Sequence, residues 1–152
     1  MNQHDEKLFK LLLDEREISR LLIRFSRCID TKNFEKYAEL YAADGELRTP
    51  WGGHSGREGL AEHVRRDLGK YEGLHHVSAG HSIDVDGDTA QVRATLLATH
   101  VTNDTGTEFW SVGGHYDINL KRIDGAWKLR VVEIHPTWRF DTSPTTEQEE
   151  SQ

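Results

Sequence analysis

The spacing of the apolar residues changes near residue 74, and this change constrains the fold more than any other feature of the sequence. Before it, apolar residues recur every three to four positions, which is the period of a helix with one buried face. After it, they alternate with polar residues, which is the period of a half-buried strand. Helices followed by a run of strands predict an α+β domain whose helices gather on one side of the sheet.

The first helix is expected to begin at Asp14 and to end near Asp30. Its start is indicated by Asp14-Glu15-Arg16-Glu17, which has the form of a capping box. The apolar residues of this helix form one stripe, made of Ile18, Leu21, Leu22, Phe25 and Ile29. The helix is therefore amphipathic and should pack this stripe against the sheet.

Two shorter helices are expected before the strands. The first carries apolar residues at helical spacing and closes at the turn pair Asp44-Gly45, before a short strand over 46–49. Its apolar residues are Phe34, Tyr37, Ala38 and Tyr41. The second follows a glycine-rich loop around His54 and Ser55. Its apolar residues, spaced four apart, are Leu60, Val64 and Leu68.

Four strand-like runs follow, at about 74–85, 89–101, 107–121 and 126–136. Glycine-containing turns of the kind that join adjacent antiparallel strands separate them. The second run keeps apolar residues on one face, and His100 ends that face. Two adjacent glycines in the third run allow the sheet to curve strongly.

The composition fits a single folded domain over residues 1–140. The chain of 152 residues has the size of one domain. Its four tryptophans and periodic apolar runs argue against disorder, although only 36% of the residues are hydrophobic. Residues 141–152 are rich in Ser, Thr, Glu and Gln and are expected to form a disordered acidic tail.

Charge and motifs exclude several classes of function. A net charge of -7 without a basic cluster disfavours nucleic acid as a partner. No segment reads as a signal or a membrane span, so we expect a cytoplasmic protein with no membrane partner. The sequence lacks a phosphate-binding loop, a dinucleotide fingerprint and a nucleophile elbow. Its single cysteine, Cys28, gives neither a disulfide framework nor a metal knuckle.

Histidines are concentrated in the strand region, where they are His75, His76, His81, His100, His115 and His135. Imidazole titrates near neutrality, so a histidine in a dry pocket can move protons. It is an effective base when a carboxylate fixes its tautomer and orientation. Asp30, at the end of the first helix, is the candidate carboxylate.

Five segments form a pattern whose order and spacing are more specific than any one of them. They are RCID at 27–30, YAELYAADG at 37–45, LHHVS at 74–78, IDVDGD at 83–88 and IDGAWK at 123–128. The pattern resembles the SnoaL-like branch of the nuclear-transport-factor-2-like superfamily. Within it, the likeness is closest to scytalone dehydratase and its bacterial relatives, from about residue 17 through 140.

The resemblance implies a cone-shaped, barrel-like fold. In this fold a strongly curved, mixed but mainly antiparallel sheet wraps around a long N-terminal helix, with two further helices. It also implies a homo-oligomer, either a dimer or a trimer, that acts on a small-molecule substrate. In this family an aspartate at the helix end orients a histidine base, and Asp30 and His76 match those two positions. A second pocket histidine matches His100, which would hold or protonate a leaving hydroxyl.

The chain also departs from the family pattern. The two tyrosines of the dehydratase fall here on Ile29 and near Arg48 or Thr49. The tyrosine and aspartate of the related ketosteroid isomerases fall on Phe25 and Thr49. The residues expected to line the pocket are Phe25, Ile29, Thr49, Trp51, Leu96, Ala98, Tyr116 and Val132.

Each catalytic candidate also has a structural explanation. Asp30 could bond to the backbone of the turn that follows it. His76 would lie on the opposite strand face from Ile83, unless a bulge near Gly80 resets the alternation. His100 could cap a strand edge.

The sequence thus predicts a cofactor-free lyase. His76 would remove a proton next to an activating group of a small, largely apolar, cyclic or aromatic-type substrate, with elimination as in a dehydratase. The same pair could serve an isomerase, a dehydrohalogenase or a polyketide cyclase, and a non-catalytic small-molecule-binding protein is the alternative of another class. No cofactor and no metal are expected, and a metal site of His76, His81 and His100 is the alternative use of these imidazoles. The other histidines are expected to face solvent or an oligomer interface.

Overall fold

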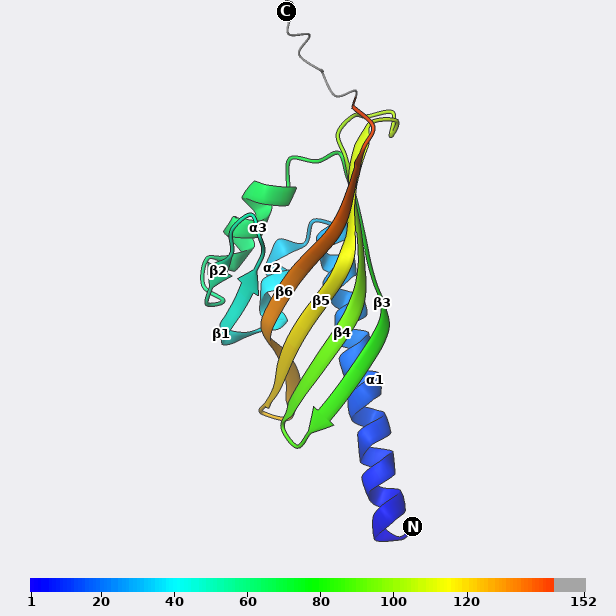
Figure 1. The fold of residues 1–152 in the computed structure, drawn as a ribbon. Helices are drawn as coiled ribbons and strands as arrows, with labels where there is room; N and C mark the ends of the chain where they lie inside the picture. The colour runs from blue at the N-terminus through cyan, green and yellow to red at the C-terminus, as the bar shows by residue number, and fades with distance from the viewer. Residues whose placement is uncertain (144–152) are drawn as a thin grey trace, which may run out of the picture.

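The computed structural model describes residues 1–143, which form three helices and one mixed sheet (Figure 1). The helices are α1 (Gln3–Asp30), α2 (Phe34–Glu39) and α3 (Leu60–Leu68). The strands are β1 (Tyr41–Arg48), β2 (His54–Ser55), β3 (Gly73–Asp86), β4 (Thr89–Val101), β5 (Phe109–Ile123) and β6 (Ala126–Asp141). The predicted α+β class is confirmed. Of the predicted tail, residues 144–152 lie outside the described residues.

The sheet has the strand order β2-β1-β6-β5-β4-β3. The four strands from β3 to β6 form an antiparallel meander, and β1 runs parallel to β6. Figure 1 shows this meander curving around α1, with α2 and α3 beside β1. Within the described residues β2 and β3 form the two edges, so the sheet is strongly curved without closing into a barrel.

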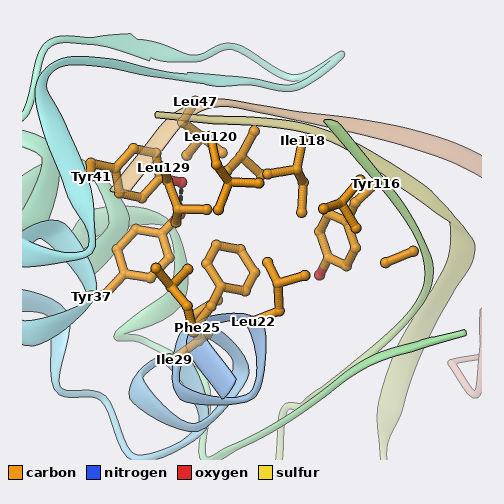
Figure 2. Close-up of a cluster of buried hydrophobic side chains, with 14 of the residues drawn as sticks. Leu22, Phe25, Ile29, Tyr37, Tyr41, Leu47, Tyr116, Ile118, Leu120 and Leu129 are labelled. Carbon is orange, nitrogen blue, oxygen red and sulfur yellow. Dashed lines mark hydrogen bonds between the residues drawn. The ribbon is translucent and has the colours of Figure 1, made fainter. Parts of the chain in front are cut away.

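The apolar stripe of α1 packs against the concave face of the sheet and forms the main core. All five stripe residues are buried: Ile18, Leu21, Leu22, Phe25 and Ile29. Figure 2 shows Leu22, Phe25 and Ile29 pointing from the helix into the space that the strands enclose. Burying a side chain of this size stabilises the fold by about 1.5–3 kcal/mol.

The prediction that α1 begins at Asp14 is wrong. The helix begins much earlier and is capped by Asn2, whose side chain accepts a hydrogen bond from the backbone N–H of Asp5 (2.9 Å). Asp14 is buried in the middle of the helix, and Arg122 Nη2 lies 2.9 Å from its Oδ1. The indole N–H of Trp127 donates to the same oxygen (3.2 Å). The carboxylate that resembled a cap is therefore part of a buried ion pair that ties α1 to the β5–β6 hairpin.

The first turns of α1 project past the end of the sheet (Figure 1) and leave Leu8, Phe9 and Leu12 exposed. Charged residues are interspersed with these apolar ones. No helix within residues 1–143 has the length and apolar character needed to cross a membrane.

The pair Asp44-Gly45 does not end a helix, as predicted, but lies inside β1. The helix before it stops at Glu39, and the pairing of β1 with β6 shifts register around this pair. A Cβ on Gly45 would come within 3.0 Å of the carbonyl oxygens of Ala42 and Leu129. A glycine is therefore required by a close backbone approach within the sheet rather than by a turn.

Two further boundaries differ from the prediction. The last strand was expected to end at Pro136, yet β6 continues through Asp141. Pro136 pairs with Gly114 beside a register shift, where its missing N–H does not break a regular ladder. In the glycine-rich loop, His54 and Ser55 form the short strand β2 against β1.

A bulge in β3 decides the orientation of His76. Between Ala79 and Ser82, β3 has one residue more than the facing part of β4, and Gly80 adopts a left-handed conformation there (φ +60°). His76 and Ile83 each pair with a buried residue of β4, so both face α1. The bulge thus resets the alternation of the strand.

The core assignment predicts different effects for two leucines of α1. Leu22→Ala should lower the free energy of unfolding by about 2–5 kcal/mol, because Leu22 is fully buried. Leu12→Ala is the matched control and should change it by less than about 0.5 kcal/mol, because Leu12 is 62% exposed. Urea unfolding measures both, and equal losses would contradict the position of the core along the helix.

Candidate active site

The end of α1 and the middle of β3 meet at Asp30 and His76. Oδ1 of Asp30 accepts a hydrogen bond from Nδ1 of His76 (2.9 Å). The backbone N–H of His76 donates to Oδ1 (2.8 Å) and to Oδ2 (3.0 Å). Within the described structure, every hydrogen bond of this carboxylate goes to His76 and none to the turn that follows the helix. The two residues that the sequence suggested as a pair are therefore in direct contact.

The carboxylate fixes the tautomer of His76. An ionised carboxylate only accepts hydrogen bonds, so we assign the proton of the ring to Nδ1. The lone pair then lies on Nε2. The His76 side chain is only 7% exposed and lines a cavity. This arrangement gives a neutral imidazole a fixed orientation as a base.

The position of Asp30 opposes the local preference of a helix. A negative charge at a helix C-terminus is unfavourable by roughly 0.3–1 kcal/mol, because the last carbonyls already carry partial negative charge. The turn after α1 places Lys32 in a left-handed conformation (φ +57°), and its amino group donates to the carbonyls of Gly69 (3.2 Å) and Tyr71. The helix end is thereby tied to the loop before β3, and tertiary contacts hold the carboxylate at His76.

His100 lies beside this pair. Its ring centroid is 5.7 Å from that of His76, and it stacks on Trp110 at 3.6 Å. Its Nδ1 lies 3.3 Å from the carbonyl oxygen of Trp110, so Nδ1 carries the proton and Nε2 is an acceptor. Burial lowers the pKa of His100 to about 4, and the neighbouring His76 adds to this effect. His100 is therefore neutral near pH 7.

His76, His100 and Trp110 line a cavity of about 330 Å³ between α1, α3 and the concave face of the sheet. A cavity of this size suits a small molecule. All but one of the predicted pocket residues line it, namely Phe25, Ile29, Thr49, Trp51, Leu96, Ala98 and Tyr116. The exception is Val132, which is fully buried in the core. Ile134, two residues further along the same face of β6, lines the cavity instead.

Several cavity residues carried no signal in the sequence. Lys70 and Tyr71 lie in the loop between α3 and β3, and a loop residue has no periodicity that shows which way it faces. Arg139 lies on β6 beyond Pro136, where the strand was expected to have ended. Its guanidinium lies 4.3 Å from the centre of the Trp110 ring. The topology of the sheet, rather than any local pattern, brings these groups to the rim of the cavity.

Two tyrosines, Tyr37 and Tyr116, line the inner side of the cavity, and Tyr41 lies buried behind Tyr37. The hydroxyls of Tyr37 and Tyr41 are 2.7 Å apart and bond to each other, as Figure 2 shows. Tyr116 packs edge-on against Phe25, with ring centroids 5.7 Å apart, and also lines the cavity. Burial raises the pKa of Tyr116, and the charge of Asp30 contributes to the rise. The phenol therefore stays protonated and can donate a hydrogen bond.

His81 does not form a metal site with His76 and His100. Its Nδ1 lies 2.7 Å from Ser19 Oγ, and its Nε2 lies 3.0 Å from Ser78 Oγ. The ring is half-buried between α1 and β3 instead of facing solvent as expected, and burial lowers its pKa. His81 is therefore a structural link between the helix and the bulge of β3.

Comparisons of the sequence with known proteins agree with the resemblance seen in the five segments. A family model described as a SnoaL-like domain matches residues 10–133. An uncharacterised protein of Mycobacterium tuberculosis is 26% identical over 118 residues, which cover 76% of this chain and 80% of that protein.

Solved structures share the fold. A candidate scytalone dehydratase from Novosphingobium aromaticivorans has a TM-score of 0.78 and 26% identity, and the match covers 88% of this chain and 90% of that one. A protein of the same organism, described as nuclear-transport-factor-2-like with a cystatin-like fold, has a TM-score of 0.73 and 25% identity over 84% of both chains. A hexachlorocyclohexane dehydrochlorinase, LinA type 2, has a TM-score of 0.79 over 89% of this chain and 93% of that one. Its identity is 17%, so this last likeness concerns the fold alone.

The buried His100 predicts how stability depends on pH. Its pKa in the folded chain, about 4, is below the ordinary value of 6.5, so between these values the unfolded chain binds a proton that the folded chain does not. The contribution of His100 should therefore destabilise the fold progressively as the pH falls from about 6.5 to about 4, and should change no further below that.

Urea unfolding across this pH range measures the effect, with His100→Phe as the comparison. Phe cannot titrate and can keep the stacking on Trp110. The variant should lose less stability than the wild type over this window. Parallel losses would contradict the assignment of a buried, neutral His100.

Proposed function

Because the chain belongs to the SnoaL-like domain family, we propose that it is a cofactor-free lyase with His76 as base and Asp30 as orienting carboxylate. The observation that carries the proposal is the hydrogen bond between Asp30 Oδ1 and His76 Nδ1 (2.9 Å) at the wall of the cavity. One similar structure, the candidate scytalone dehydratase, is named for an elimination, which supports this reaction class.

The proposed reaction begins with proton abstraction. Nε2 of His76 takes a proton from the carbon next to a carbonyl, and Asp30 stabilises the imidazolium that forms. The electron pair of the broken C–H bond moves into the carbonyl group and gives an enolate. When the enolate re-forms the carbonyl, a C=C bond forms to the neighbouring carbon while the C–O bond to the hydroxyl on that carbon breaks. His76 returns the proton to the departing oxygen, so the products are an unsaturated carbonyl compound and water. Since one imidazole takes and returns the proton, hydrogen and hydroxyl leave from the same face of the substrate.

His100 is proposed to hold the leaving hydroxyl. Its Nδ1–H is engaged with the carbonyl of Trp110 and its ring is neutral, so Nε2 can accept a hydrogen bond from the hydroxyl group. The stacking on Trp110 fixes the plane of the ring. This role needs no proton from His100 itself, which suits a histidine whose pKa is about 4.

Tyr116 is the proposed donor to the substrate carbonyl. By the resemblance, the two tyrosines of scytalone dehydratase fall on Ile29 and near Arg48 or Thr49. Another group must therefore stabilise the negative charge that develops on the carbonyl oxygen. Tyr116 lines the same cavity, and its raised pKa keeps its proton in place. A fixed donor of this kind stabilises an enolate more strongly than the ground state.

The cavity supports a small, largely apolar substrate of cyclic or aromatic type. Its walls are mainly aliphatic and aromatic, and its volume of about 330 Å³ is at the lower end for ligand pockets. The charged residues Asp67, Lys70 and Arg139 lie at the rim, where solvent can reach them. A flat ring of modest size could stack against the aromatic walls with its carbonyl directed toward Tyr116.

The same dyad would also serve an isomerase, a dehydrohalogenase or a polyketide cyclase, because each of these reactions starts with proton abstraction at an activated carbon. A non-catalytic protein that binds small molecules is the alternative of a different class. The absence of tyrosine at the positions that match the dehydratase tyrosines favours this alternative. Such a protein would bind ligands without turning them over.

Turnover of a panel of cyclic β-hydroxy ketones, followed by the absorbance of the conjugated product, tests the dyad. His76→Ala and Asp30→Asn should each lower kcat/KM by roughly 10²–10⁴-fold, because each removes oriented proton transfer. His75→Ala is the matched control and should keep wild-type activity, since His75 is exposed beside His76 on the other face of β3. Unchanged rates in both dyad variants would overturn the lyase proposal. Binding of the panel without turnover by the wild type would favour the non-catalytic alternative.

Tyr116→Phe tests the carbonyl donor. The variant keeps the edge-on packing against Phe25 and removes only the hydroxyl, so the fold should be unaffected. The expected result is a loss of roughly 10²-fold in kcat with little change in KM, because the donor acts mainly on the developing charge. A wild-type kcat in this variant would exclude the assigned role of Tyr116.

A further inference from the structure

Four side chains that can bind metals gather on the outer face of the sheet, away from the cavity. They form the outer-face cluster: His115 and Asp117 on β5, and Glu133 and His135 on β6. His115 pairs across the strands with His135, and Asp117 pairs with Glu133, so the cluster is a grid of two adjacent cross-strand pairs. Their neighbours in the sequence point into the core, which places all four on the opposite face.

Donor atoms of the cluster converge on one oxygen. Nε2 of His135 lies 3.1 Å from Asp117 Oδ2, and Nε2 of His115 lies 3.5 Å from the same oxygen. Oε1 of Glu133 is 3.1 Å from His135 Nε2. Within residues 1–143, His115, Asp117 and His135 are the group of potential ligands whose donor atoms all lie within 4.8 Å of one another.

These separations match the edge of a metal coordination tetrahedron. Zinc binds imidazole nitrogen and carboxylate oxygen at about 2.0–2.2 Å, so neighbouring ligand atoms in a tetrahedral site lie about 3.3 Å apart. The separations of 3.1 and 3.5 Å between the imidazole nitrogens and Asp117 Oδ2 fall on both sides of this value. Ligands on two paired strands also lose little conformational freedom when they bind an ion.

A second shell supports Asp117. Arg93, on β4, donates from Nε to Oδ1 of Asp117 (2.9 Å) and from Nη2 to Oδ2 (3.2 Å). Both hydrogen bonds pair the carboxylate with the guanidinium, which holds Asp117 in place as a candidate ligand. Oδ2 accepts one hydrogen bond from Arg93, so the second of its two lone pairs can bind an ion. Outer-shell partners of this kind orient ligands in known metal sites.

We propose that His115, Asp117 and His135 bind a divalent transition-metal ion of the zinc class on the outer face of the sheet, and that Glu133, which contacts His135 but lies outside this group of three, turns toward the ion as the fourth ligand. The mixture of imidazole and carboxylate ligands selects such ions over calcium and magnesium, which prefer oxygen alone. The side chains of the cluster are 31–39% exposed, so an ion can reach them from solvent. The bound ion would clamp β5 to β6. The proposal is independent of the lyase reaction, because the cluster and the cavity lie on opposite faces.

Titration of chelator-treated protein with Zn²⁺ by calorimetry tests the site. The wild type should bind one ion per chain, and His115→Ala and His135→Ala should each weaken binding roughly tenfold or more. His75→Ala and His76→Ala are matched controls, in an exposed position and in the cavity, and both should bind as the wild type does. His63→Ala serves as a control for the other close histidine pair, since the His54 and His63 ring centroids are 5.3 Å apart.

Two further measurements separate loss of the site from loss of the fold. Asp117→Asn and Glu133→Gln keep the shape of the side chains, and the visible absorption of bound Co²⁺ should change in both. Zn²⁺ should raise the Tm of the wild type and of His75→Ala but not that of His135→Ala, because an ion that binds only the folded chain stabilises it. The proposal is overturned if the wild type binds no Zn²⁺, if His115→Ala and His135→Ala both bind it as tightly as the wild type, or if His63→Ala alone abolishes binding.

Discussion

The packing of α1 along the concave face of the sheet is the interaction on which the rest of the structure depends. The stripe from Ile18 to Ile29 fills the inside of the curve, so strands that would otherwise expose an apolar face are covered by one helix. The buried Asp14–Arg122 ion pair fixes the helix at the β5–β6 end, and the Asp30–His76 contact fixes it at the other end of the buried segment. The candidate site therefore forms where the core stops being completely filled, at the C-terminal end of the helix.

Burial acts differently on each polar group of the cavity, and the differences assign the roles. It keeps His100 neutral and Tyr116 protonated, so that one accepts and the other donates hydrogen bonds. Asp30 is more exposed than His76, and it keeps its place through three hydrogen bonds to a single residue. When the buried imidazole of His76 takes up a proton, its positive charge lies next to the more exposed carboxylate of Asp30. No isolated charge therefore forms in the apolar interior.

Periodicity was enough to predict the helix stripe, α3 and the four long strands, because an element that buries one face carries apolar residues at the period of that face. It failed where a residue serves a tertiary contact instead of its usual local role. Asp14 resembles a cap but forms a buried ion pair, and Gly45 resembles a turn but allows two backbones to approach. In the site, the resemblance to a known family brought Asp30 and His76 together, whereas Tyr71 and Arg139 reach the cavity only through loop path and strand length. Those depend on the whole sheet and not on neighbours in the sequence.

Because of the single extra residue at Gly80, the positions of β3 that face inward differ before and after the bulge. Even-numbered positions such as His76 face inward before the bulge, and odd-numbered positions such as Ile83 and Val85 face inward after it. A regular strand of the same sequence could satisfy only one half, either presenting the imidazole to the cavity or covering the lower core. The position of His76 and the hydrophobic packing of Ile83 and Val85 therefore both depend on this bulge. A one-residue insertion or deletion there would turn either His76 or the two apolar side chains to the outer face of the sheet.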